Sequence, residues 1–173
     1  MILIILKLLV LVIAVPYQSQ EAVGWYKFND CGPAVAEMVY EYYTGNVHTV
    51  RELYQEFDMS EDKGMSGFVL RQWFREHGLS SEYTTGNTLD WLLAQDTPVI
   101  VEIDYSVFRH AGILDGDTWD LHFVVVVGHA DNYIVIHDPL TGPYKVVPLS
   151  LFEEAWSLPY NWVSNPATVV SNE

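Results

Sequence analysis

The sequence predicts an α+β domain, in which helices come first along the chain and antiparallel strands come later. Apolar residues recur at helical spacing in the first half, as at Val35, Met38 and Val39, whereas short runs rich in β-branched residues dominate the second half. The chain has 173 residues, of which 50% are hydrophobic and 14% aromatic, so it can bury the core of one domain. We therefore expect a helical lobe packed on a small antiparallel sheet or half-barrel.

The first fifteen residues, 1–15, are apolar at all positions but one. This run is shorter than the ~20 residues that a membrane-spanning helix needs. It fits a signal peptide, with an apolar core over 8–15 and Ala14 at the end of a cleavage site, and it equally fits a buried strand. We divide the chain into an apolar segment, 1–14, and one domain, 15–173. The first alternative implies an exported protein and the second a cytoplasmic one, and we expect membrane association only through residues 1–15.

Four helices are predicted in the first half, after a loop over 17–29. The first begins at about residue 31 and ends at Gly45, where glycine can terminate it. Thr49 can cap the second helix, with Glu52 placed three residues on as in a capping box. Ser66 and Thr88 can cap the other two in the same way. The expected ranges of these last three helices are 49–57, 66–76 and 88–93.

The second half is predicted to consist of strands. They are expected over 98–103, 121–128, 133–137 and 144–147, with a last short helix over 149–156. Between the first two strands, the stretch 105–120 is predicted to be a long loop because it carries glycines and several aspartates. A turn over 130–132 would join the second and third strands into a hairpin.

Cys31 is the only cysteine of the chain and lies at the predicted start of the first helix, in the sequence Asn29-Asp30-Cys31-Gly32-Pro33-Ala34. A helix N-terminus presents free N–H groups and partial positive charge, which favour a thiolate over a thiol. A lone cysteine cannot form an internal disulfide or hold a structural metal by itself. It is therefore a candidate nucleophile, although a single cysteine is more often a small buried apolar residue.

A cysteine nucleophile needs a base, and the base needs an orienting group. His122 and Asp138 can supply both, because a turn centred on Ala130 would place them directly opposite each other on one face of the hairpin. In the alternative interpretation, His122 is a histidine at the edge of the core and Asp138 begins an ordinary turn. His129 would fall at the turn and His137 would face away from Asp138. We therefore expect neither a metal site built from these histidines nor a cofactor.

The formal net charge of −15 argues against nucleic-acid binding, which needs a basic face. It suits basic or neutral partners instead. Asp115, Asp117 and Asp120 precede His122 and have two interpretations: they border a cleft, raise the pKa of His122 and favour basic substrate residues, or they form a plain turn. Three aromatic residues could line subsites or belong to the core: Trp25, Tyr26 and Trp119.

Four spaced stretches together resemble the motifs of one enzyme family. They are Val15-Pro16-Tyr17-Gln18-Ser19-Gln20, then Asp30-Cys31-Gly32-Pro33-Ala34, then HFVVVVG over 122–128, and Asp138-Pro139 followed by Gly142. In this order they resemble the papain-like cysteine peptidases that are grouped with the double-glycine leader peptidases of bacteriocin exporters. Phe152 and Trp156 are similar to the closing pattern of the same family.

The resemblance implies a stand-alone papain-like peptidase, with Cys31 as nucleophile, His122 as base and Asp138 as the orienting group. It also implies Gln20 as the side-chain oxyanion donor, with Gln18 as the competing choice. The implied reaction is cleavage of peptide bonds in a peptide or protein substrate through a thioester acyl-enzyme, without a cofactor. Two alternatives stay open: an amidase or acyltransferase on the same fold, and a non-catalytic binding protein that retains the scaffold.

Overall fold

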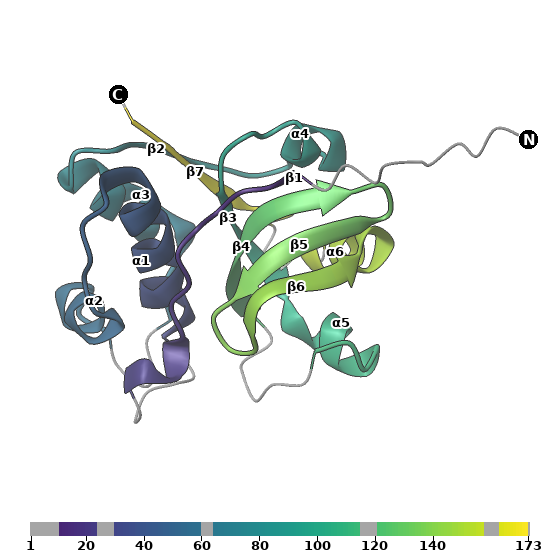
Figure 1. The fold of residues 1–173 in the computed structure, drawn as a ribbon, viewed down its shortest axis with the longest axis horizontal. Coiled ribbons are helices and arrows are strands. Elements are labelled where there is room, and N and C mark those ends of the chain that lie inside the picture. Colours follow the sequence, from purple (N-terminus) through teal and green to yellow (C-terminus); the bar gives the residue numbers. More distant parts are fainter. Residues whose placement is uncertain (1–10, 24–29, 60–63, 115–120, 158–162, 173) are drawn as a thin grey trace, which may run out of the picture.

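The computed structural model describes residues 11–23, 30–59, 64–114, 121–157 and 163–172. A helical lobe, built by α1, α2 and α3, lies beside a curved antiparallel sheet (Figure 1). The helices are η1 (Gln20–Val23, a 3-10 helix), α1 (Cys31–Thr44), α2 (Val50–Glu56), α3 (Gly67–Glu76), α4 (Leu89–Leu93), α5 (Tyr105–His110) and α6 (Leu149–Ser157). The strands are β1 (Leu11–Val12), β2 (Ser80–Thr84), β3 (Val99–Asp104), β4 (Leu121–Ala130), β5 (Tyr133–Asp138), β6 (Gly142–Pro148) and β7 (Ala167–Ser171).

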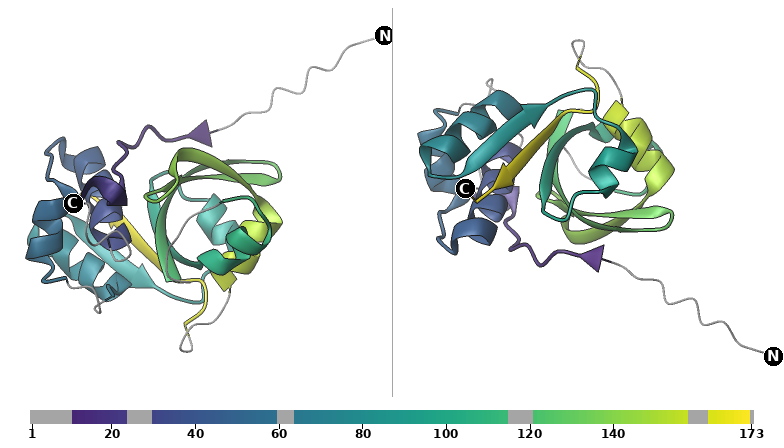
Figure 2. Two further views of the ribbon diagram at one scale, coloured as in Figure 1. Left: turned by 90° about the horizontal axis from the view of Figure 1, so that it is seen from below. Right: turned by 90° about the horizontal axis from the view of Figure 1, so that it is seen from above.

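All strands belong to one sheet. Its order is β2-β7-β3-β4-β5-β6, and β1 pairs with the far part of β4. The views of Figure 2 show the strands β3–β6 curving into a half-barrel, with α6 against its open side. The predicted α+β architecture, a helical lobe on an antiparallel half-barrel, is therefore confirmed.

Two hydrophobic cores meet at the strand β4, which is buried on both faces. Phe123, Val125 and Val127 pack against the helical lobe, whereas Val124 and Val126 face the half-barrel with residues of α5 and α6. A strand covered on both sides needs apolar residues at successive positions rather than at alternate ones. This explains the unbroken apolar run in β4, and it makes β4 the element that both lobes share.

Most of the predicted helix signals act as expected. Thr49 and Glu52 form the complete capping box of α2, and the Thr88 side chain accepts a hydrogen bond from the backbone N–H of Trp91. Gly45 ends α1 in a left-handed conformation, with φ of 69°, which glycine adopts without steric cost. Ser66 occupies the N-cap position of α3, but its side chain makes no capping hydrogen bond, so this part of the prediction was wrong.

The loop predicted over 105–120 was wrong in its first part, because Tyr105–His110 forms the helix α5. Asp104 caps this helix by accepting a hydrogen bond from the backbone N–H of Ser106 at 2.9 Å, and Phe108 is buried in the half-barrel core. The strands β2 and β7 were not predicted, and residues 20–23 of the expected loop form η1.

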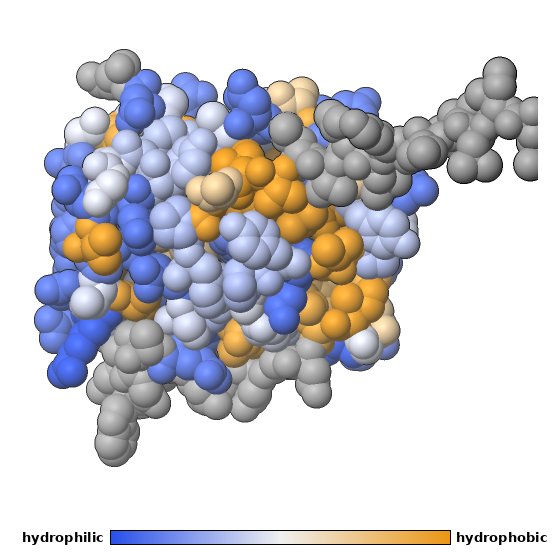
Figure 3. Space-filling view, viewed as in Figure 1, coloured by the Kyte–Doolittle hydropathy of each residue, from blue (hydrophilic) through white to orange (hydrophobic). Residues whose placement is uncertain are grey.

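Several predictions fall outside the described residues. They concern most of the segment 1–14, the three aspartates at 115, 117 and 120, and the aromatic residues Trp25, Tyr26 and Trp119. Within the described ranges, no helix has the length and apolar character to cross a bilayer. Figure 3 shows apolar side chains gathered over the strands of the half-barrel. Val12 of β1 and Val146 of β6 are among the exposed apolar residues.

Candidate active site

The hairpin of β4 and β5 brings His122 and Asp138 together, but not by the predicted register. Ala130 pairs with Tyr133, so the turn is centred between residues 131 and 132 rather than at Ala130. The two residues are therefore not directly opposite each other, and this detail of the prediction was wrong. The pairing also shifts by one residue between Val126 and Gly128, which makes Val127 the extra residue of a β-bulge.

This bulge decides which face of the sheet His122 occupies. Beyond it, Val125 pairs with His137, so Asp138 comes opposite position 124 and His122 lies two residues further along. Side chains two residues apart on a strand share a face and reach each other diagonally across the ladder. Without the bulge, Asp138 would come opposite Val125, and His122 would point to the other side of the sheet.

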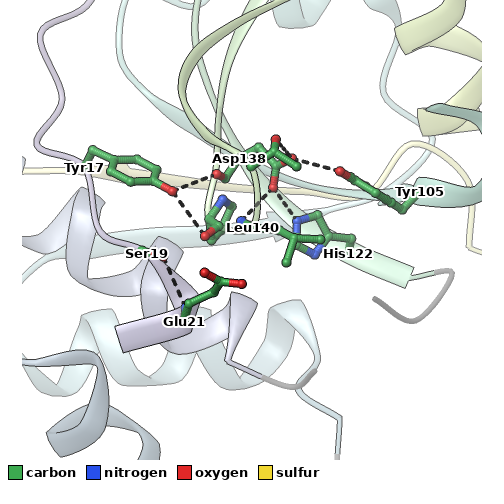
Figure 4. Close-up of polar contacts among 9 residues, drawn as sticks. Tyr17, Ser19, Glu21, Tyr105, His122, Asp138 and Leu140 are labelled. Carbon is green, nitrogen blue, oxygen red and sulfur yellow. Dashed lines mark hydrogen bonds and ion pairs between the residues drawn. The ribbon is translucent and has the colours of Figure 1, made fainter. Parts of the chain in front are cut away.

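The contact between the two side chains is short and buried. His122 Nε2 lies 2.8 Å from Asp138 Oδ1, and neither side chain is exposed to solvent. The same carboxylate accepts hydrogen bonds from the backbone N–H of Leu140 at 2.9 Å, from the Tyr105 hydroxyl at 3.2 Å and from the Thr141 hydroxyl. Figure 4 shows His122, Tyr105 and Leu140 converging on Asp138.

These donors determine the charge of Asp138. Burial alone would raise the pKa of this carboxyl group, but the hydrogen bond and charge of His122, together with Thr141 and the Leu140 N–H, lower it below its ordinary value. The group is therefore a carboxylate at neutral pH. Tyr105 and Thr141 were not predicted, and no pattern around them in the sequence marks them as partners of Asp138.

Cys31 is the first residue of α1, and its free thiol is buried beside His122. Nδ1, the ring nitrogen of His122 that points away from Asp138, is buried on the side of Cys31, with which the ring interacts. Burial would lower the pKa of His122, but Asp138 and the neighbouring Cys31 outweigh burial and raise it to about 9. The imidazole is therefore protonated at neutral pH and lies between a sulfur atom and a carboxylate.

Asp30, the residue before Cys31, is also fully buried, and neither of its carboxylate oxygens has a hydrogen-bond partner in the part of the chain that the structure describes. Burial raises the pKa of Asp30 to about 7. In its protonated form this group, at the N-cap of α1, adds no negative charge at the start of the helix. Sequence reasoning missed this residue, although it lies within the quoted motif.

The two candidate oxyanion donors occupy different surroundings. Gln20 begins η1, is fully buried, and its backbone N–H donates a hydrogen bond to the carbonyl of Pro139 at 3.0 Å. Gln18 donates from Nε2 to Glu41 at 3.4 Å. Glu41 lies ten residues after Cys31, about 15 Å along the helix, so this contact holds Gln18 away from the sulfur.

The segment that carries Gln20 is hydrogen-bonded to the end of β5. The Tyr17 hydroxyl donates to the carbonyls of Asp138 and Pro139 at 3.1 and 3.2 Å (Figure 4). His137 lies on the opposite face from Asp138, as predicted, and its Nε2 contacts the carbonyl of Val15 at 3.0 Å, while its Nδ1 accepts from the N–H of Tyr144. Burial lowers the pKa of His137, which keeps the imidazole neutral for both contacts.

Among the described residues, no group of three or more histidine, cysteine and acidic side chains is arranged to hold a metal ion. The structure does contain an imidazole that interacts with a thiol and with a carboxylate, and a buried amide side chain on an adjoining segment. Such a set can generate a nucleophile and move a proton to a leaving group.

The chain resembles known peptidases in sequence and in fold. The model of the family described as Peptidase_C39 like family matches residues 12–161. Among solved structures, the chain is similar to a double glycine motif protease from an AMS/PCAT transporter in complex with the leader peptide (20% identity over 94% of each chain, TM-score 0.68). A protein from Bacillus anthracis described as a C39-like peptidase has 16% identity over 95% of this chain and 98% of its own, with a TM-score of 0.69.

The peptidase domain of Streptococcus ComA, a bi-functional ABC transporter involved in a quorum sensing pathway, has 18% identity over 84% of this chain and 93% of its own, with a TM-score of 0.61. No protein in the curated set matches the chain. At these identities the solved structures establish the fold, and with the family match they confirm the resemblance seen in the sequence motifs.

Proposed function

The chain belongs to the Peptidase_C39 like family, and from this premise we propose that it is a cysteine peptidase that cleaves peptide bonds through a thioester on Cys31. The observation that carries the proposal is the position of His122, whose Nε2 lies 2.8 Å from Asp138 and whose Nδ1 is buried on the side of Cys31. The solved relative in complex with a leader peptide supports a peptide substrate.

In the first step, the Cys31 thiolate attacks the carbonyl carbon of the scissile bond and forms a C–S bond, and the carbonyl oxygen becomes an oxyanion. The intermediate then collapses, the C–N bond breaks, and His122 transfers the proton on Nδ1 to the leaving amine. Asp138 keeps the imidazole oriented through Nε2 and stabilises its positive charge without taking the proton itself.

In the second step, water attacks the thioester. The now neutral His122 accepts one proton from this water and the C–S bond breaks. The thiolate and the imidazolium are restored, and the carboxylic acid product releases the other water proton to solvent as it ionises. The high pKa of His122 supports this cycle, because the imidazole is then protonated at neutral pH and holds the proton that the leaving amine needs.

Two donors are proposed for the oxyanion: the side-chain amide of Gln20 and the backbone N–H of Cys31. The N–H groups of the first turn of a helix have no partner within the helix and are available to an anion. Removal of one donor from such a site costs roughly 3 kcal/mol of barrier height. The contact of Gln18 with Glu41 supports the choice of Gln20 over Gln18.

The proposal is tested by incubating the full chain with a mixed peptide library and identifying new peptide termini by mass spectrometry. Cys31→Ala is the inactive control, and circular dichroism checks that it remains folded. We expect fragments with the wild-type protein only. The masses of the two fragments of one peptide should add up to the mass of that peptide plus one water. Products that carry an added acceptor would indicate acyl transfer instead. The absence of any fragment, or the same fragments with Cys31→Ala, would contradict the proposal.

A further inference from the structure

A pocket near the Cys31–His122 pair is lined by residues of α3, β2, β3 and β4. It has a volume of about 320 Å³ and is bounded by Met65 and Leu121, among other residues. Leu121 precedes His122 in β4, and Met65 packs so closely on Gly32, the residue after Cys31, that a Cβ at Gly32 would lie 2.6 Å from the Met65 sulfur. One lining residue of the pocket is therefore next to His122 in the sequence, and another contacts the residue that follows Cys31. Its volume is at the lower end of the range found for ligand pockets.

The walls of this pocket are apolar and aromatic. Phe68 at the start of α3 and Tyr83 of β2 form one side, with ring centroids 4.6 Å apart. The Phe68 side chain is 61% exposed, so its ring is open to a ligand. Such walls suit the aliphatic part of a long side chain, which can lie along apolar surface while its polar end extends further.

Two acidic residues also line the pocket. Glu102 and Asp104 are two residues apart on β3 and both border it. The Asp104 carboxylate is engaged in capping α5, whereas Glu102 makes no hydrogen bond or ion pair with any described residue. Burial raises the pKa of Glu102 to about 7, because its charge lacks solvent. None of the described residues that border the pocket is a lysine, arginine or histidine.

We propose that this pocket is a substrate subsite that takes a lysine or arginine side chain of the peptide and pairs it with the Glu102 carboxylate. The aliphatic stem of the side chain would lie against Phe68 and Tyr83, and the cationic end would supply the partner that Glu102 lacks. The inference rests on the proposed peptidase function, since it names the class of substrate for the same site.

The test measures binding rather than cleavage, so that it does not depend on the chemistry. The full chain carrying Cys31→Ala is titrated with labelled eight-residue peptides of glycine and alanine, in which one arginine is placed at each position in turn. A second set carries citrulline, which has nearly the shape of arginine but no charge. The ratio of the two dissociation constants at each position is read from fluorescence anisotropy.

We expect arginine to bind about tenfold more tightly than citrulline at one position, as is typical of a hydrogen-bonded charge. Glu102→Gln should bring this ratio close to one. Glu82→Gln is the matched control. Glu82 precedes Tyr83 on β2 and is exposed, and the substitution removes the same charge as Glu102→Gln. It should leave the ratio unchanged, which distinguishes binding at the subsite from the general attraction of a cationic peptide to a chain of net charge −15. Near-ultraviolet circular dichroism confirms that each variant is folded.

Equal binding of arginine and citrulline at every position would overturn the proposal. So would a preference that survives in Glu102→Gln, or an absence of binding by all arginine peptides. A chain that shows the position-specific preference but cleaves no peptide would refute the peptidase function while leaving the subsite in place.

Discussion

Replacing Asp138 by asparagine removes the charge behind His122 and nearly preserves the shape of the side chain. In the native protein, Oδ1 accepts from His122 and from the Leu140 N–H, while Oδ2 accepts from the hydroxyls of Tyr105 and Thr141. An asparagine can keep its oxygen toward His122 and turn its NH₂ toward the two hydroxyls, which can accept as well as donate. We therefore expect Asp138→Asn to fold.

The size of the effect follows from the loss of one charged hydrogen bond in a buried site. Such a bond contributes about 1.5–3 kcal/mol, against about 1 kcal/mol for a neutral one, and one pKa unit corresponds to about 1.4 kcal/mol. The difference of about 0.5–2 kcal/mol should lower the pKa of His122, about 9 in the native protein, by about 0.4 to 1.5 units. The value of kcat/KM should decrease about two- to thirtyfold, and its alkaline limb should move to lower pH.

The assay is an NMR titration of the ¹⁵N-labelled histidine side chains, together with the kinetics of a library peptide that the wild-type protein cleaves. Tyr105→Phe is the matched control, because it removes one hydrogen bond to the same carboxylate but keeps the charge, and it should reduce kcat/KM by less. If His122 titrates in Asp138→Asn as in the wild type, the charge of Asp138 does not raise the pKa of the imidazole.

Three further changes have defined outcomes. Gln20→Ala should lower kcat about 10²–10³-fold with little change in KM, whereas Gln18→Ala should be close to wild type; equal losses in steady-state kinetics would exclude Gln20 as the donor. Burial raises the pKa of Glu37 to about 7, so the folded state holds this proton more tightly and wild-type stability should fall as pH rises from 5 to 8. Glu37→Gln should reduce that fall by on the order of 2 kcal/mol in urea denaturation, and an unchanged slope would contradict the assignment. A Cβ at Gly67 would lie 2.1 Å from the ring of Tyr83, so Gly67→Ala should lower the free energy of unfolding by about 1–3 kcal/mol, measured in the same way; no loss would show that the ring moves freely.

The helices of the first half could be predicted because their signals are local. Thr49 with Glu52, Thr88 and Gly45 each act within one turn of the chain, and neighbouring residues suffice to identify them. The same holds for the placement of Cys31 at the start of α1. Ser66 shows the limit of such reasoning, since it occupies the expected position without making the expected bond.

Elements that depend on distant partners could not be predicted in this way. The strand β2 is polar and becomes a strand because it pairs with β7, which lies more than eighty residues later. The helix α5 follows a strand without a break, and Phe108 is held in place by burial in the half-barrel rather than by a local pattern.

The candidate active site depends both on local sequence signals and on distant pairing. The hairpin could be expected to bring His122 near Asp138, and the sequence motifs pointed to the same pair. The bulge at Val127 could not be expected, because Val127 lies in an uninterrupted run of valines and nothing in that run marks the extra residue. The predicted register and the observed one nevertheless agree on the shared face, since the offset between them is an even number of residues.

The proposed mechanism requires that the sulfur of Cys31 is paired with the imidazole of His122. The most direct measurement is the rate of alkylation of Cys31 by iodoacetamide between pH 4 and 9, in the wild type and in His122→Ala. We expect rapid labelling below pH 7 in the wild type and much slower labelling in the variant. A wild-type rate that follows the pH profile of an ordinary thiol, or that does not change in His122→Ala, would show that the two groups are not paired.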